Sequence, residues 1–99
     1  EPQPAENWDG ILDATEDLPQ CYQEDSSGVA LGQEDCLYLN VYTPQSPADN
    51  YDSYKDVMIF IHGGGFYENS GRQDLYSPEY LMTEDIILVT INYRLGIFG

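Results

Sequence analysis

The chain has 99 residues, of which 41% are hydrophobic and 13% aromatic, which is enough apolar material for a packed core and too much for a disordered acidic tail. Eighteen acidic residues against three basic ones give a formal net charge of −15, which repels nucleic-acid backbones and anionic membrane surfaces. No stretch reaches the roughly 20 apolar residues that a membrane-spanning helix requires. We therefore expect no nucleic-acid partner and no membrane span in this segment.

The N-terminal third of the chain, residues 1–33, is rich in Pro, Gly, Asp and Gln and predicts an irregular surface segment with short turns. Its first ten residues, EPQPAENWDG, have neither the basic start nor the apolar centre of a signal peptide. The residues alone leave two explanations open. The protein is intracellular, or its true beginning lies upstream of residue 1.

Cys21 and Cys36 are the two cysteines of the chain. A disulfide between them would close a loop of about 15 residues and stabilise the fold by about 3 kcal/mol in the chain-entropy model. Two buried, reduced thiols are the alternative, because free cysteine is often a small core residue. A zinc site is not expected, since two thiols and the single histidine, His62, fall short of four ligands.

Three stretches have the pattern of β-strands. Residues 37–42, LYLNVY, alternate with a period of two and predict a half-buried strand that Pro44 ends, followed by a loop over 44–56. Residues 57–62 and 86–93 are nearly continuous apolar runs, which are typical of strands buried on both faces of a parallel sheet.

One short helix is predicted between the two apolar strands, over residues 77–85. Ser77 suits the N-cap, Pro78 the first helical position, and Glu79 the first turn, where its charge complements the helix dipole. The order strand, glycine loop, helix, strand indicates the α/β class, with a parallel pair joined by a crossover. One helix cannot cover both faces, and the sequence stops in the apolar segment RLGIFG, so we expect an incomplete portion of a larger fold.

Three consecutive glycines, residues 63–65, follow the first apolar strand and allow three interpretations. A phosphate-binding loop fits poorly, because Glu68 stands where a dinucleotide-binding loop needs its third glycine and no Gly-Lys-Ser/Thr follows. A purely structural role in a tight turn is the second interpretation. The third is an oxyanion hole, since His-Gly-Gly-Gly after a buried strand is the arrangement of lipases and esterases, and the pattern favours it.

Three motifs in order resemble the type-B carboxylesterase family. EDCLYLNVYTP, residues 34–44, resembles the family signature, and HGGGF, residues 62–66, and NYRLGIFG, residues 92–99, follow it at the expected distances. This family consists of α/β-hydrolases of several hundred residues that include carboxylesterases, juvenile hormone esterases and cholinesterases. The resemblance implies that residues 1–99 are the N-terminal part of a carboxylesterase type-B domain, with a mostly parallel central sheet flanked by helices that is incomplete in this chain.

The resemblance also assigns roles around the glycines. It makes Gly64 and Gly65 the oxyanion-hole donors, with Gly63 mainly permitting the turn. His62 resembles a histidine that supports this loop and not the catalytic base. The nucleophilic serine, the acid and the base are expected beyond residue 99, and no metal or cofactor is expected.

Cys21 and Cys36 match the first disulfide of the family, and this match implies a structural disulfide and a secreted or secretory-pathway protein. The loop between them, YQEDSSGVALGQED, lacks the tryptophan with which cholinesterases stack on a quaternary ammonium. This difference favours a general or arthropod-like carboxylesterase. Phe66 and Tyr67 either line the substrate gorge or pack in the interior.

Two functions follow as hypotheses. The first is a carboxylic-ester hydrolase that acts on a small-molecule ester through an acyl-enzyme, with this segment supplying the oxyanion loop. The second is a catalytically inactive, cholinesterase-like adhesion or scaffold protein that keeps the fold as a binding surface. An intact His-Gly-Gly-Gly favours catalysis, because a binding protein does not need two free amides.

Overall fold

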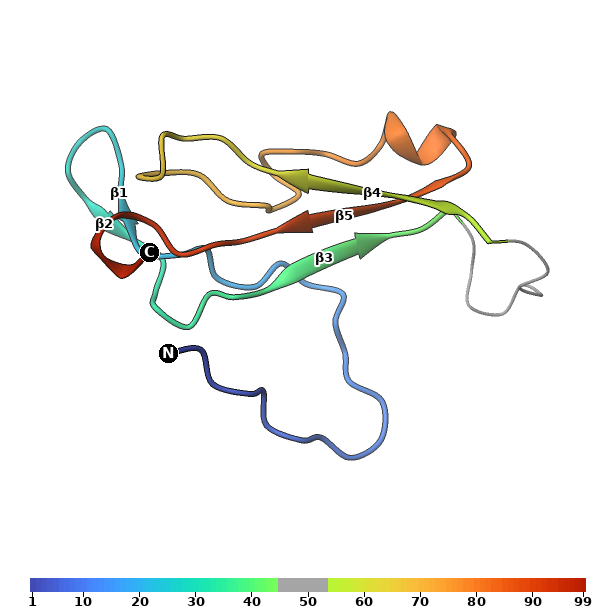
Figure 1. The fold of residues 1–99 in the computed structure, drawn as a ribbon, viewed down its shortest axis with the longest axis horizontal. Helices are drawn as coiled ribbons and strands as arrows, with labels where there is room; N and C mark the ends of the chain where they lie inside the picture. Colours follow the sequence, from blue (N-terminus) through green and yellow to red (C-terminus); the bar gives the residue numbers. More distant parts are fainter. Residues whose placement is uncertain (45–53) are drawn as a thin grey trace.

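The computed structural model describes residues 1–44 and 54–99 and contains five strands and two single turns of 3₁₀-helix within them (Figure 1). Most of the predicted loop over 44–56 lies outside the described residues. The elements in chain order are β1 (Gln23–Glu24), β2 (Ala30–Leu31), β3 (Leu39–Tyr42), β4 (Asp56–Ile61), η1 (Leu81–Thr83), β5 (Ile86–Ile91) and η2 (Gly96–Phe98).

Three strands form a mixed sheet in the order β3-β5-β4, with β5 in the centre (Figure 1). The strands β4 and β5 pair in parallel from Asp56 opposite Ile86 to Ile61 opposite Ile91, which confirms the predicted parallel pair. The short strand β3 runs antiparallel to β5. The strands β1 and β2 form a separate antiparallel hairpin inside the loop between the two cysteines.

The burial of the apolar strands differs from the prediction. Leu88 and Thr90 on one face of β5 are buried, whereas Val57, Ile59 and Ile61 of β4 are 57%, 62% and 64% exposed. Burial on both faces is therefore wrong for β4 within the described part of the chain. The physical reason is its position at the edge of the sheet, where neither a further described strand nor a helix layer covers it.

The predicted helix over residues 77–85 is reduced to η1, a single turn over Leu81–Thr83 that has no side-chain N-cap. The Ser77 hydroxyl does accept the backbone N–H of Glu79 at 3.4 Å, as an N-cap would. The segment is too short to continue, because the first turn of a helix is costly and each further residue adds only one hydrogen bond. The helix prediction is therefore wrong in length and type.

The buried apolar cluster consists of Cys21, Cys36 and Leu95, with Tyr93 packed against it. The two cysteines form a disulfide, which confirms the predicted bond. Asn92, directly after β5, donates to the Cys36 carbonyl and accepts the N–H of Gly71, so the cluster lies near the C-terminal end of β5, where the glycine loop, residues 62–71, returns. The core thus sits beside the loop and not under the exposed strand β4.

We expect the 99-residue chain, expressed by itself, to unfold without a cooperative transition. The apolar side chains of β4 and its unpaired edge favour association over a compact monomer. The measurement is a urea titration followed by circular dichroism, with sedimentation in parallel. A sharp two-state transition of a monomer would contradict the expectation.

Candidate functional site

The glycine loop begins where β4 ends and reverses the chain in a tight turn. Gly64, Gly65 and Phe66 have φ values of 115°, 59° and 67°, so three consecutive residues lie in the region that favours glycine. The Gly64 carbonyl accepts the N–H groups of Tyr67 at 3.0 Å and Glu68 at 3.2 Å and closes the turn. This turn is what requires glycine in the sequence.

The three glycines are not equivalent. A Cβ atom on Gly64 would overlap the carbonyl oxygen of Glu68, whereas one on Gly65 would lie 3.9 Å from Tyr67 Cδ2, an ordinary contact. Gly63 has no positive φ, and no atom lies within 4 Å of where its Cβ would stand. The expectation that Gly63 mainly permits the turn is therefore wrong, because Gly64 and Gly65 take the unusual backbone angles.

The amide groups of Gly64 and Gly65 are unpaired among the described residues. Neither donates a hydrogen bond to any other residue that the structure describes. Gly65 is exposed and Gly64 half-buried, so the turn lies at the surface of the described chain. Successive backbone N–H groups in a turn of this kind form a concavity suited to an anionic oxygen.

His62 fixes the start of the turn. Its Nδ1 atom lies 2.7 Å from the Gly63 carbonyl oxygen, which can only accept, so Nδ1 donates. The ring stacks on Tyr93 at a centroid distance of 4.3 Å, and the Tyr93 hydroxyl donates to the His62 carbonyl at 2.8 Å. Because a peptide unit is planar, holding the Gly63 carbonyl also sets the direction of the Gly64 N–H.

Phe66 and Tyr67, whose role the sequence left open, are 75% and 76% exposed. Neither side chain therefore packs in the interior of the described chain. Both line a pocket of about 720 Å³ together with Tyr22 and Phe98. The Phe66 carbonyl accepts the Gly96 N–H at 2.8 Å, which ties the outer part of the loop to the segment after β5.

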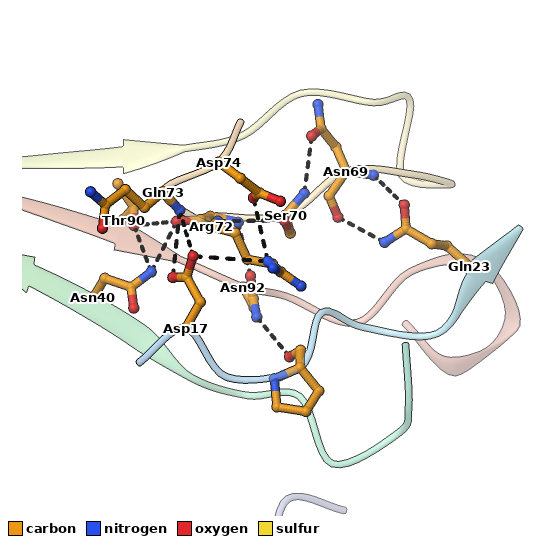
Figure 2. Close-up of polar contacts among 12 residues, drawn as sticks. Asp17, Gln23, Asn40, Asn69, Ser70, Arg72, Gln73, Asp74, Thr90 and Asn92 are labelled. Atoms are coloured by element: carbon orange, nitrogen blue, oxygen red, sulfur yellow. Dashed lines mark hydrogen bonds and ion pairs between the residues drawn. The ribbon is translucent and has the colours of Figure 1, made fainter. Parts of the chain in front are cut away.

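The far end of the loop is held by polar side chains from the sheet (Figure 2). The Gly71 carbonyl accepts Asn40 Nδ2 at 3.0 Å and Thr90 Oγ1 at 2.5 Å, and the Gly71 N–H donates to Asn92 Oδ1 at 2.8 Å. A Cβ on Gly71 would lie 2.7 Å from the Ile91 carbonyl oxygen, so this backbone rests directly on β5. Glycine is required here for close approach.

Asn92 connects this contact with the disulfide segment. Its Nδ2 atom donates to the carbonyl of Cys36 at 3.1 Å and to that of Pro19 at 3.3 Å (Figure 2 draws the bond to the proline). Asn92, in the third motif, therefore contacts Cys36 of the first motif and Gly71, which lies five residues after the second. Sequence reasoning missed Asn40, Thr90 and Asn92, although a polar residue inside or directly after an apolar strand was a signal that it could have used.

A sequence model of the carboxylesterase family matches residues 1–99. The chain belongs to the carboxylesterase family. Juvenile hormone esterase of Tribolium castaneum is 46% identical over 99% of the chain and 17% of that relative, and esterase E4 of Myzus persicae is 45% identical over 100% and 18%. The chain thus spans less than a fifth of the length of these two members of the family.

A solved member of the family has the same fold. The crystal structure of juvenile hormone esterase from Manduca sexta, with OTFP covalently attached, matches 98% of the chain and 19% of its own length, with a TM-score of 0.81 and 40% identity. This match confirms the predicted class, a portion of an α/β-hydrolase fold. Within the described ranges, no helix is long and apolar enough to cross a membrane, and no three His, Cys, Asp or Glu residues are grouped to hold a metal ion.

We expect Gly64→Ala to destabilise the full-length protein and Gly63→Ala to leave it unchanged. The first substitution combines a positive φ with an overlap on the Glu68 carbonyl, and such backbone strain costs about 1 to 3 kcal/mol. The second adds a methyl group in open space at a residue whose φ is not positive. Thermal unfolding of the two variants checks this, and equal midpoints would contradict the assigned turn.

Proposed function

We propose that the full-length protein is a carboxylic-ester hydrolase that acts through an acyl-enzyme on a serine outside residues 1–99. Residues 1–99 are proposed as the N-terminal part of its type-B domain, with Gly64 and Gly65 as oxyanion-hole donors. The observation that carries the proposal is the pair of adjacent amides that are unpaired among the described residues, on a turn held at both ends. Membership of the carboxylesterase family supports the reaction.

The chemistry follows from the position of the two donors. The serine oxygen attacks the ester carbonyl carbon, and the carbonyl oxygen takes the negative charge of the tetrahedral intermediate. Two N–H groups aimed at that oxygen stabilise it without reorganisation, and one such donor is worth about 3 to 4 kcal/mol of transition-state free energy. The base expected beyond residue 99 takes the serine proton and gives it to the alcohol that the intermediate expels. Water then attacks the acyl-enzyme and gives its proton to the base, the second oxyanion uses the same two donors, and collapse releases the carboxylic acid and restores the serine.

Substrate and compartment belong to the proposal as well. The absence of a tryptophan between Cys21 and Cys36 supports a general carboxylesterase, and the name of the Tribolium relative makes juvenile hormone the first ester to test. The disulfide supports a secreted or secretory-pathway protein, because disulfides persist in oxidising compartments.

We expect the full-length protein to hydrolyse a chromogenic ester and to be labelled by a fluorophosphonate probe that reacts with activated serines. Prior labelling should lower turnover in proportion to the fraction of protein that is modified and abolish it when all of the protein is modified. A folded, full-length protein that neither turns over the ester nor takes up the probe would instead be the inactive adhesion or scaffold protein.

We expect Gly65→Ala to lower kcat of the full-length enzyme about a hundredfold, or about 3 kcal/mol, with KM nearly unchanged. The added methyl group has room at Tyr67, so the loss arises at the oxyanion and not from overlap inside the chain. Gly28→Ala is the matched control, since Gly28 also has a positive φ of 78° and open space around it but lies in the hairpin between the cysteines. Equal kcat values for the two variants would remove Gly65 from the role.

A further inference from the structure

A polar contact joins the disulfide loop, residues 21–36, to the glycine loop, and none of the three sequence motifs accounts for it. Gln23, in β1, lies two residues after Cys21, and its side chain reaches the backbone of Asn69 (Figure 2). Its Oε1 atom accepts the Asn69 N–H at 2.7 Å, and its Nε2 atom donates to the Asn69 carbonyl at 3.0 Å. Nε2 also donates to the Cys21 carbonyl at 3.0 Å.

We propose that Gln23 is a positioning residue for the oxyanion hole, which it orients by clamping the backbone of Asn69. The proposal rests on the proposed ester hydrolysis and adds a residue that the glycine motif does not contain. Gln23 makes no hydrogen bond to either glycine amide and acts through Asn69, in the segment that follows the turn.

The clamped residue has a conformation that needs external support. Asn69 has a φ of 92°, which a non-glycine residue rarely adopts unless its surroundings enforce it. Its side chain is engaged elsewhere, with Oδ1 accepting the Ser70 N–H and Nδ2 donating to the Tyr76 hydroxyl. The two bonds from Gln23 therefore hold the backbone of Asn69 on both its donor and its acceptor.

The clamp reaches Gly64 through a single peptide unit. The Asn69 N–H and the Glu68 carbonyl belong to the same planar peptide, so fixing one fixes the other. The Glu68 carbonyl oxygen lies so close to Gly64 that a Cβ there would overlap it, and the Glu68 N–H donates to the Gly64 carbonyl. His62 thus acts on Gly64 through the Gly63 carbonyl on its N-terminal side. Gln23 acts on Gly64 through the peptide unit between Glu68 and Asn69, which packs against it.

The experiment uses the full-length protein with Gln23→Ala, Gln23→Glu and the control Gln33→Ala. Gln33 lies in the same disulfide loop, and its side chain donates one bond, to the Asp35 carbonyl at 2.7 Å. Ester kinetics give kcat and KM, and hydrogen exchange reports the Asn69 amide. We expect Gln23→Ala to lower kcat at least tenfold with KM within twofold and to speed exchange at Asn69, while Gln33→Ala changes none of these.

Gln23→Glu provides a readout that a merely structural role would not move. The ionised carboxylate can still accept the Asn69 N–H but cannot donate, and the protonated acid regains one donor. Its kcat relative to wild type should therefore rise as the pH falls towards the ordinary carboxyl pKa of about 4.3.

The outcomes separate this inference from the proposed function. Faster exchange at Asn69 without loss of kcat, or no change in either, overturns the positioning role. A wild-type protein without turnover overturns the proposed hydrolysis and the catalytic meaning of the clamp together. The clamp then stands as a structural contact only if exchange at Asn69 still rises in Gln23→Ala.

Discussion

The position of the glycine loop depends on one buried stretch of its backbone, at Gly71, whose N–H and carbonyl need hydrogen-bond partners from the sheet and the residue that follows it. Gly71 lies against the backbone of β5, where water cannot satisfy its N–H and carbonyl, and an unpaired buried backbone group is costly. Asn40, Thr90 and Asn92 supply the partners. These three side chains fix where the loop after β4 returns, and the geometry of the glycine turn follows from that fixed end.

The glycine turn is strained, and its supports come from separate parts of the chain. Left-handed backbone angles at Phe66 and Asn69 persist only when the surroundings over-determine them. Tyr93, from the segment after β5, stacks on the His62 ring and donates to the His62 carbonyl at the start of the loop. Gln23, from the disulfide loop, accepts the N–H of Asn69 near the end of the loop. A turn held at both ends keeps the Gly64 and Gly65 amides, which are unpaired among the described residues, in one direction, and the proposed oxyanion stabilisation would use that preorganisation.

The disulfide has a wider role than closing its own loop. Cys21 and Cys36 form the buried cluster with Leu95, and the carbonyl groups of both cysteines accept side-chain amides, from Gln23 and Asn92 respectively. The covalent bond therefore fixes two acceptors on which the glycine loop indirectly depends. The apolar side chains of β4, by contrast, are exposed, because no described residue covers them.

The sequence by itself determined the parallel apolar strands, the cysteine pair and the glycine loop, because strand periodicity, residue chemistry and local backbone freedom are properties of short stretches. It predicted a helix at Ser77 that became one 3₁₀ turn, since propensity does not decide length when the segment is short. Only the tertiary structure decided that Gly64, and not Gly63, makes the turn, and that Gln23 reaches Asn69 across 46 positions. Such contacts form only because β5 and the disulfide bring segments together that are far apart in the sequence. A pattern within a short stretch carries no information about which distant segment it will meet.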